Sequence, residues 1–369
     1  CKVVMSERRQ GAMLNMLELP TVFRRKKRDT DHRYESVDLE DGQDARLRRA
    51  DSGFFSARVR KWMKIGLGML VVARIYVYFF IVVITPLELN DDKPIDHVCE
   101  YLDTERIEER QRGLGKPVKD LKIALLTFEY KMDPDVVRES RDNQRRYAQK
   151  HGYTYLVTDQ LVDTSLRPAP WSKFPIIKRF LPEYDFIVWL DTDALIANYT
   201  VKIEDVVNGK SNLFFAEDES QLNSGVFIIR NSPWSLWWLN EAAAQSWLVS
   251  GSHPFKYEQR AIHFLYGTER LNKDARKHGQ PMYPRAAEVQ ANTEIVPYCA
   301  LNSNICEEFW FGFMLYRRPH VPGWHCANKY ENGDFILHLA GRSPSSYRDW
   351  LFLKFKPMID SRGKRLGLW

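Results

Sequence analysis

The sequence is poor in cysteine, with five in 369 residues, and none of them form the Cys-x-x-Cys pairs that are typical of structural zinc sites. It contains no internal repeat, so a repeat architecture is not expected. Most of the chain also lacks a basic excess. Residues 1–64 hold 16 of the 54 Lys+Arg and 10 of the 48 Asp+Glu, which leaves 38 of each for residues 65–369. Because a nucleic-acid-binding domain carries its positive charge on the folded part, we do not expect a nucleic-acid partner.

One long apolar run stands out, at residues 65–84. Its 20 residues contain a single charge, Arg74, and could cross a hydrocarbon core of about 30 Å. Basic residues precede the run and acidic residues follow it, which predicts a cytoplasmic N-terminus. A buried core helix is the alternative, and a cleaved signal peptide is disfavoured by the late start. We therefore expect a cytoplasmic, largely disordered tail at 1–64, a transmembrane signal-anchor helix at 65–84, a stem at 85–120 and a catalytic domain at 121–369.

This single-pass type II topology places four cysteines on the oxidising side of the membrane, namely Cys99, Cys299, Cys306 and Cys326. Four cysteines can form two disulfides in three ways, and their spacing does not choose among them. The chain has one N-glycosylation sequon, Asn198-Tyr199-Thr200. Its presence agrees with a lumenal location, although such tripeptides are common by chance.

Strand and helix patterns alternate from residue 121 onward. Strands are expected at 122–128, 153–158, 186–190, 212–216, 226–229 and 335–339, and helices at 135–150, 171–181, 232–249 and 347–358. A cap at Ser232 and a proline at position 233 open the third helix. This alternation predicts an α/β fold with a doubly wound, mostly parallel sheet flanked by helices, which binds ligands at the carboxyl ends of its strands.

An Asp-x-Asp motif follows the apolar stretch FIVWL at 186–190 directly, so Asp191 and Asp193 are predicted to lie at that ligand-binding edge. Two carboxylates one residue apart can hold a divalent cation against a diphosphate, and the cation can stabilise a leaving group that gains negative charge. A solvated pair of acids at a strand end is the plain alternative. His338, within the later stretch FILHL, is a candidate third ligand, and an imidazole would favour Mn²⁺ over Mg²⁺.

Five segments occur in the order and approximate spacing of glycosyltransferase family 34. They are RRYAQKHGYTY, WSKFPIIKRFLPEYDFIVWLDTDALI, LNSGVFIIRNSPWS, YEQRAI and GDFILHLAG. The resemblance covers roughly residues 121–341, and the combination is far more specific than any one motif. The family includes plant xyloglucan xylosyltransferases, galactomannan galactosyltransferases and fungal Golgi mannosyltransferases. The resemblance implies a GT-A type, Rossmann-like fold.

The resemblance also implies roles for individual residues. Asp191 and Asp193 match the metal- and nucleotide-binding Asp-x-Asp, with Thr192 between them, and His338 matches the late metal-binding histidine. Gln259, with Glu258 beside it, matches a glutamine near the reacting face of retaining enzymes. The remaining donor contacts are Thr127, Phe128, Lys173, Asn223, Ser224, Gly225 and Gly341. Without the family pattern, Asn223 would be read as a turn former, Lys173 and Glu258 as exposed helix charges, and Gln259 as a surface amide.

Two departures from the family pattern bear on the donor and the acceptor. Relatives often carry a cysteine and a nearby lysine after the glycine of the late motif, where this chain has Arg342, which we assign to the diphosphate because arginine can bind phosphate bidentately. Plant members have two acidic residues before the glutamine, where this chain has Tyr257-Glu258. Trp171, Trp234, Trp237 and Trp238 could stack on sugar faces, but helical spacing favours core packing for the last three.

Taken with the resemblance, the sequence predicts a Golgi-membrane glycosyltransferase with a lumenal catalytic domain. It would use Mn²⁺, with Mg²⁺ as the alternative, to move a hexose or pentose from UDP-galactose, UDP-xylose or GDP-mannose onto a polysaccharide or glycoprotein glycan with retention of configuration. Complexes with other Golgi transferases are a further expectation. Two rival functions stay open: a HAD-like phosphatase using the Asp-x-Asp, and a catalytically inactive, membrane-anchored scaffold derived from a transferase.

Overall fold

The structure is a computed structural model, and it describes residues 62, 64–75, 99–162, 167–218, 221–249, 257–268, 276, 279, 281–305, 307–311, 314–318, 329–340 and 345–369. The chain divides into two units, Cys1–Gly68 and Met69–Trp369. Residues 64–75 are helical, and the rest of the predicted 65–84 span lies outside the described residues. Among the helices that are described, none combines the length and the apolar character that a bilayer span requires. Apart from residues 62 and 64, the predicted tail at 1–64 also lies outside the described residues, as do residues 85–98 of the predicted stem. Residues 99–120 of that stem are folded and include a helix at Thr104–Arg112.

A six-stranded mixed sheet forms the centre of the second unit, in the order β2-β1-β3-β6-β5-β7. Its strands are β1 (Ile123–Phe128), β2 (Thr154–Thr158), β3 (Phe186–Leu190), β5 (Leu213–Asp218), β6 (Gln221–Arg230) and β7 (Thr293–Val296). The pairs β1–β2, β1–β3 and β5–β7 are parallel, whereas β6 is antiparallel to both β3 and β5. Five strands therefore run in one direction and β6 runs against them, which confirms a mostly parallel α/β sheet.

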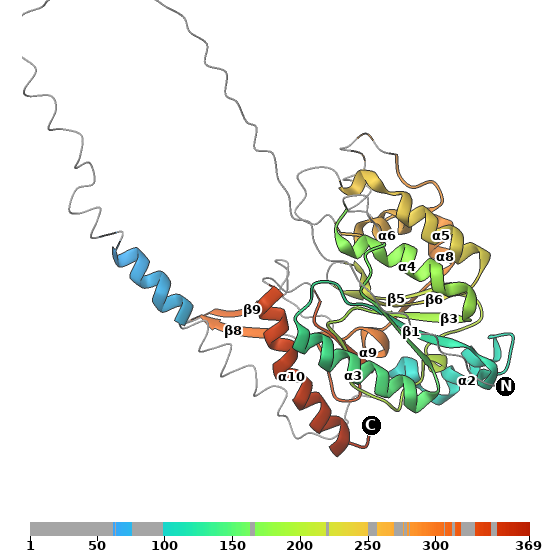
Figure 1. Cartoon of the computed structure of the whole chain (residues 1–369), viewed down its shortest axis with the longest axis horizontal. Coiled ribbons are helices and arrows are strands. Elements are labelled where there is room, and N and C mark those ends of the chain that lie inside the picture. The colour runs from blue at the N-terminus through green and yellow to red at the C-terminus, as the bar shows by residue number, and fades with distance from the viewer. Residues whose placement is uncertain are drawn as a thin grey trace, which may run out of the picture. The chain divides into compact units, whose positions relative to one another are not determined.

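Helices cover both faces of this sheet (Figure 1). On one side lie α4 (Lys173–Phe180), α5 (Pro233–Ala244), α6 (Gln259–Tyr266) and α8 (Ala286–Ala291), and on the other α2 (Thr104–Arg112), α3 (Pro134–His151), α9 (Tyr298–Leu301) and α10 (Ser345–Arg365). The period-two alternation of β3 explains this arrangement. Ile187 and Trp189 pack with the α4–α6 side, whereas Phe186, Val188 and Leu190 pack with the α3 side, so the strand is buried on both faces.

Local signals in the sequence set the bounds of the helices. At α3, the Asp133 side chain accepts hydrogen bonds from the N–H groups of Asp135 and Val136, Pro134 occupies the first turn, and Gly152 ends the helix with φ of 73°. At α5, the Ser232 hydroxyl accepts from the Ser235 N–H, which confirms the predicted cap. The helix expected at 171–181 is α4 flanked by 3₁₀ turns at Ala169–Ser172 and Leu181–Glu183.

Two smaller sheets accompany the main sheet in the described part of the chain. Strand β4 (Ala194–Ile196) pairs antiparallel with β10 (Ile336–His338), and β8 (Glu307–Phe311) pairs antiparallel with β9 (Met314–Arg318). The stretch expected at 335–339 is therefore a strand, but it does not join the main sheet. It lies against β4 because the chain turns sharply after β3, and the Ala194 N–H donates to the Asp191 carbonyl in that turn.

Covalent and buried contacts anchor the N-terminal end of the folded part. Cys99 and Cys299 form a disulfide with their Cα atoms 5.8 Å apart, which selects one pairing that spacing had left open. Cys306 and Cys326 lie outside the described residues. The sequon asparagine, Asn198, is buried, donates its amide N–H to the Gly333 carbonyl and accepts from Thr200. A glycan on Asn198 would have no room in this fold.

Candidate functional site

The two aspartates of the Asp-x-Asp motif lie where β3 ends. Leu190 is the last residue of β3, and the Asp191 N–H still donates to the Gly225 carbonyl of the neighbouring β6 at 2.8 Å. Thr192 lies in the turn, with its hydroxyl donating to the Phe128 carbonyl at the end of β1. Asp193 then precedes β4. Both carboxylates are thus held at the carboxyl edge of the sheet, as the sequence predicted.

His338 reaches this edge through the pairing of β4 with β10. In that register His338 lies opposite Ala194, and the Leu339 N–H donates to the Asp193 carbonyl at 3.1 Å. The result is a cluster in which one ligand atom from each of Asp191, Asp193 and His338 lies within 4.8 Å of the others. Among the described residues these three side chains therefore meet the geometric requirement for a shared divalent cation.

Each carboxylate divides its two oxygens between the cluster and a protein donor. For Asp191, Oδ1 accepts a hydrogen bond from the Trp189 indole N–H at 2.7 Å and lies 3.4 Å from the Lys173 ammonium nitrogen. The other oxygen, Oδ2, lies on the side of Gly225 and His338. Removal from water raises the pKa of Asp191, and the positive charge of Lys173 opposes this rise.

The two carboxylate oxygens of Asp193 also have different neighbours. Its Oδ1 lies 3.4 Å from His338 Nε2, and its Oδ2 lies 3.6 Å from Nε of Arg348, in the first turns of α10. Burial alone would raise the pKa of Asp193, but the adjacent imidazole of His338 and the guanidinium of Arg348 outweigh burial and lower it. Arg348 carried no motif in the sequence, so its place beside the cluster could only be found from the fold.

A residue outside the recognised motifs orients the histidine. Nδ1 of His338 lies 2.9 Å from Oδ1 of Asn302, which follows α9 and is buried. An amide oxygen only accepts hydrogen bonds, so this contact assigns the imidazole proton to Nδ1. The lone pair of Nε2 then faces Asp193, as a metal ligand requires. No local sequence signal marks Asn302.

Gly225 makes room for the cluster. A Cβ at this position would lie 2.0 Å from Cε1 and 2.6 Å from Nε2 of His338, and 3.0 Å from Oδ2 of Asp191. Two of these atoms, Nε2 of His338 and Oδ2 of Asp191, are ligand atoms of the cluster. The glycine of the Leu-Asn-Ser-Gly stretch is thus required by close approach, and the ring, the carboxylates and the glycine together form a cradle that fits a cation.

A buried polar network supports the cluster from the α4 and α6 side. The Lys173 ammonium, 2% exposed, donates to the Ser224 carbonyl at 2.6 Å and to Oε1 of Glu258 at 2.7 Å. Burial would lower the pKa of Lys173, but Asp191 and Glu258 outweigh it and raise the pKa. The Ser224 hydroxyl oxygen lies 2.9 Å from Oε1 of Glu258 and 3.0 Å from Oε1 of Gln259, so its one proton is shared between these two acceptors. Lys173 and Glu258 are therefore not exposed helix charges.

Other predicted donor residues take structural contacts in this fold. The Thr127 hydroxyl donates to the Leu190 carbonyl at 2.7 Å, and the Phe128 ring stacks on Tyr130 with centroids 5.7 Å apart. Asn223 lies inside β6, not in a turn; its amide donates to Asp218, and its oxygen accepts from the Gly225 N–H. The predicted contacts Gly341 and Arg342 lie outside the described residues.

The tryptophans do not all behave as expected. Trp171 is fully buried and packs edge-on against Phe174, so it is not among the rings that could stack on a sugar. It lies under α4 in the main core because the 3₁₀ turn at Ala169–Ser172 points the ring inward. Trp238 is fully buried too, and Trp234 and Trp237 pack at the edge of the same core, in line with the helical spacing.

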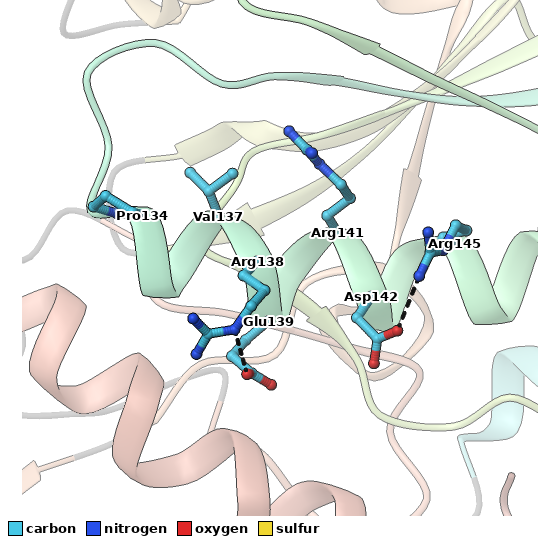
Figure 2. Close-up of a pocket in the computed structure, with 7 residues that line it drawn as sticks. All are labelled: Pro134, Val137, Arg138, Glu139, Arg141, Asp142 and Arg145. Atoms are coloured by element: carbon cyan, nitrogen blue, oxygen red, sulfur yellow. Dashed lines mark hydrogen bonds and ion pairs between the residues drawn. The ribbon is translucent and has the colours of Figure 1, made fainter.

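A separate hollow of about 490 Å³ runs along the exposed side of α3 (Figure 2). Three arginines line it, Arg138, Arg141 and Arg145, and none of the predicted site residues does. Each of the three is paired with an acid: Arg138 with Glu139, Arg145 with Asp142, and Arg141 with Glu129. Their charge is therefore balanced locally, and the metal cluster remains the stronger candidate for chemistry.

Known proteins resemble the chain in the region that builds this cluster. Residues 124–214 match the galactosyl transferase GMA12/MNN10 family, and this segment includes Lys173, Asp191 and Asp193. The chain is a relative of glycosyltransferase family 34. Beyond the matched segment, Asn223, Gln259 and His338 lie at positions that resemble the family's later motifs, and the structure brings His338 to the two aspartates.

The chain aligns with only part of each family 34 relative. A probable xyloglucan 6-xylosyltransferase of Arabidopsis thaliana is 26% identical over 226 residues, which cover 58% of this chain and 48% of that protein. An uncharacterized alpha-1,2-galactosyltransferase of Schizosaccharomyces pombe is 26% identical over 28% of this chain and 38% of its own length. The chain thus spans about half the length of the curated relatives it matches, or less. A solved glycosyltransferase involved in glycosylation of the PBCV-1 major capsid protein matches at 15% identity over 63% of this chain and 99% of its own, with a TM-score of 0.42.

Proposed function

We propose that the chain is a metal-dependent glycosyltransferase of GT-A type. It would transfer a hexose or pentose from a nucleotide-sugar, with UDP-galactose, UDP-xylose and GDP-mannose as the candidate donors, onto a glycan of a polysaccharide or glycoprotein. The observation that carries this proposal is the convergence of Asp191, Asp193 and His338 at one strand end, within a chain related to family 34. Mn²⁺ is the proposed cation, with Mg²⁺ as the alternative.

A cation held by these three residues would neutralise the diphosphate that leaves as the glycosidic bond breaks. The residues around it serve that step by fixing the ligands. Trp189 and Lys173 hold Asp191 through Oδ1, so Oδ2 remains directed at the cluster. Asn302 fixes the imidazole of His338 with Nε2 toward Asp193. Ligands held in this way need little reorganisation when the donor binds, which favours the transition state.

Retention of configuration is part of the proposal. In such a transfer the acceptor attacks on the face that the nucleotide leaves, and the departing phosphate oxygen takes the acceptor proton. We assign Gln259 to this face, and its Oε1 is held by β6, since it accepts from the N–H and hydroxyl of Ser224. Glu258 is tied to Lys173 and Ser224, so we assign it to positioning Lys173.

The cellular setting is also proposed, from the sequence. An N-terminal anchor at 65–84 would make the protein a single-pass type II Golgi membrane protein with its catalytic domain in the lumen, where it could associate with other transferases. The disulfide between Cys99 and Cys299 supports an oxidising compartment for this part of the chain.

A panel of nucleotide-sugars tests the proposal. The purified chain is incubated with each of the three donors, with and without Mn²⁺, and release of the nucleotide is followed with and without oligosaccharide acceptors. We expect Mn²⁺-dependent release from one donor, and its loss in His338→Ala and Asp193→Asn. Lys178→Gln, an exposed change on α4 outside the cluster, is the control. NMR of the product anomer tests retention, and an inverted product would refute that part.

The same panel separates the rival functions. A HAD-like phosphatase would use Asp191 as a nucleophile and would release phosphate from phosphomonoesters. An inactive scaffold would show no nucleotide release with any donor. Asp191 is held by Trp189 and Lys173 through one oxygen and faces His338 with the other, an arrangement that suits a ligand better than a nucleophile. Phosphatase activity that survives His338→Ala would favour the first rival.

A further inference from the structure

Besides Lys173, a second cationic side chain lies beside the cluster. It is Arg348, which belongs to no recognised motif. Nε of Arg348 lies 3.6 Å from Oδ2 of Asp193, and Oδ1 of the same carboxylate lies 3.4 Å from His338. Arg348 therefore occupies the side of Asp193 that faces away from the imidazole. The guanidinium and a cation on Oδ1 would share one carboxylate.

Lys173 and Arg348 stand in similar positions but are held differently. Lys173 is 2% exposed and is fixed by Glu258 and the Ser224 carbonyl in addition to Asp191. The Arg348 side chain is 20% exposed, and its hydrogen bonds go to Asp349, the next residue on α10, and to the sulfur of Met132. Lys173 is thus a fixed part of the interior, whereas Arg348 is open to solvent at the rim of the cluster.

Resting on the proposed function, we infer that Arg348 competes with the divalent cation for Asp193 in the empty site and binds the donor diphosphate in the filled one. Both roles follow from charge. A guanidinium beside Asp193 repels a cation arriving at the other oxygen, so a bare cation binds weakly. A diphosphate attached to that cation brings negative oxygens to the same rim, where the guanidinium can pair with them through its planar set of donors.

The consequence is that metal and nucleotide bind together better than either binds alone. Arg348 opposes binding of the bare cation and assists binding of the cation together with the nucleotide, so it couples the two ligands. Removing its charge should therefore shift the two affinities in opposite directions. A residue with a purely structural role would weaken both, and a residue that does not touch the site would change neither.

Arg348→Gln tests this in the full chain, with Mn²⁺ alone, UDP with Mn²⁺, and GDP with Mn²⁺ as probes. Binding of Mn²⁺ is read by electron paramagnetic resonance and binding of nucleotide by calorimetry. We expect Mn²⁺ alone to bind about tenfold more tightly than in the wild type. The nucleotide–Mn²⁺ pair that the wild type binds should bind about tenfold or more weakly, the range expected when a charge-assisted hydrogen bond is lost.

Two further variants serve as a second test and as a control. Arg348→Lys keeps the charge and loses the planar fork, so Mn²⁺ alone should bind as in the wild type while the nucleotide–Mn²⁺ pair binds more weakly. This variant carries the test if Arg348→Gln does not fold, which thermal unfolding will show. Arg365→Gln is the matched control, since it removes an equal charge from the exposed far end of α10, about 25 Å along the helix.

The outcomes distinguish failure of this inference from failure of the proposed glycosyltransferase function on which it rests. A wild-type chain that binds Mn²⁺ but neither nucleotide overturns the proposed function and the inference together. A wild-type chain that binds one nucleotide with Mn²⁺, together with an Arg348→Gln variant whose two affinities stay unchanged or both fall, overturns the inference alone.

Discussion

Gly225→Ala is the sharpest probe of the cluster, because the added methyl group enters the space where the ligands meet. The new Cβ would lie 2.0 Å from Cε1 of His338, whereas ordinary contacts begin at 3.4 Å. The ring must therefore retreat by about 1.4 Å, since 3.4 Å less 2.0 Å is 1.4 Å. A bound metal tolerates ligand displacements of only about 0.2 Å. His338 cannot move so far and remain a ligand together with Asp191.

The expected loss can be stated from this displacement. Disturbing a residue that merely supports a ligand costs about 10- to 100-fold in metal affinity, so displacing the ligand should cost at least about 100-fold, or roughly 2.8 kcal/mol. The extra methyl in a packed interior should also lower the free energy of unfolding by about 1 to 3 kcal/mol. Mn²⁺ titration followed by electron paramagnetic resonance measures the first effect, and thermal unfolding measures the second.

Two variants make the experiment specific to the imidazole. Gly113→Ala adds the same methyl group at a helix end where its nearest contacts are 3.4 and 3.7 Å and φ is −81°, so it should leave both quantities unchanged. In a His338→Ala background, Gly225→Ala should cost less stability than it does alone, because the ring it strikes is gone. Wild-type Mn²⁺ affinity in Gly225→Ala would refute the placement of His338 in the cluster.

Two further predictions concern residues that support the site and the fold. Asn302→Ala removes the acceptor that fixes the imidazole and should weaken Mn²⁺ binding about 10- to 100-fold, whereas Asn302→Asp, which keeps an acceptor, should weaken it less; equal effects in a titration would contradict this role. Lys356 lies 3.0 Å from Glu139 and lowers the pKa of Glu139 below its ordinary 4.5. The stabilisation is therefore complete above about pH 4.5 and is lost as pH falls through the lower, folded-state pKa. The difference in melting temperature between wild type and Glu139→Gln, worth at most about 1 kcal/mol, should shrink in acid, and a constant difference would argue against the pairing.

Periodicity and local signals in the sequence were sufficient for the elements that flank the site. The apolar run at 186–190 is a strand buried on both faces, and the caps at Asp133 and Ser232 begin helices as such residues do. Strands β4, β7, β8 and β9 were not predicted; β4 and β7 have only three or four residues, which carry too little periodicity. The late stretch at 335–339 was recognised as a strand. Its pairing with β4 could not be predicted, because the residue pattern of a strand does not specify which strand lies next to it.

For the site, the sequence by itself determined the chemistry of the ligands: two carboxylates after an apolar strand, and a histidine in a later one. The tertiary structure decided how they are held. Gly225 has to be small because a ring from β10 lies against it, and Asn302 orients that ring from the end of α9. Arg348 approaches Asp193 only because the first turns of α10, which follows β10 in the chain, lie beside the cluster. These contacts join segments far apart along the chain, and no local pattern encodes a distance between side chains that only chain folding brings together.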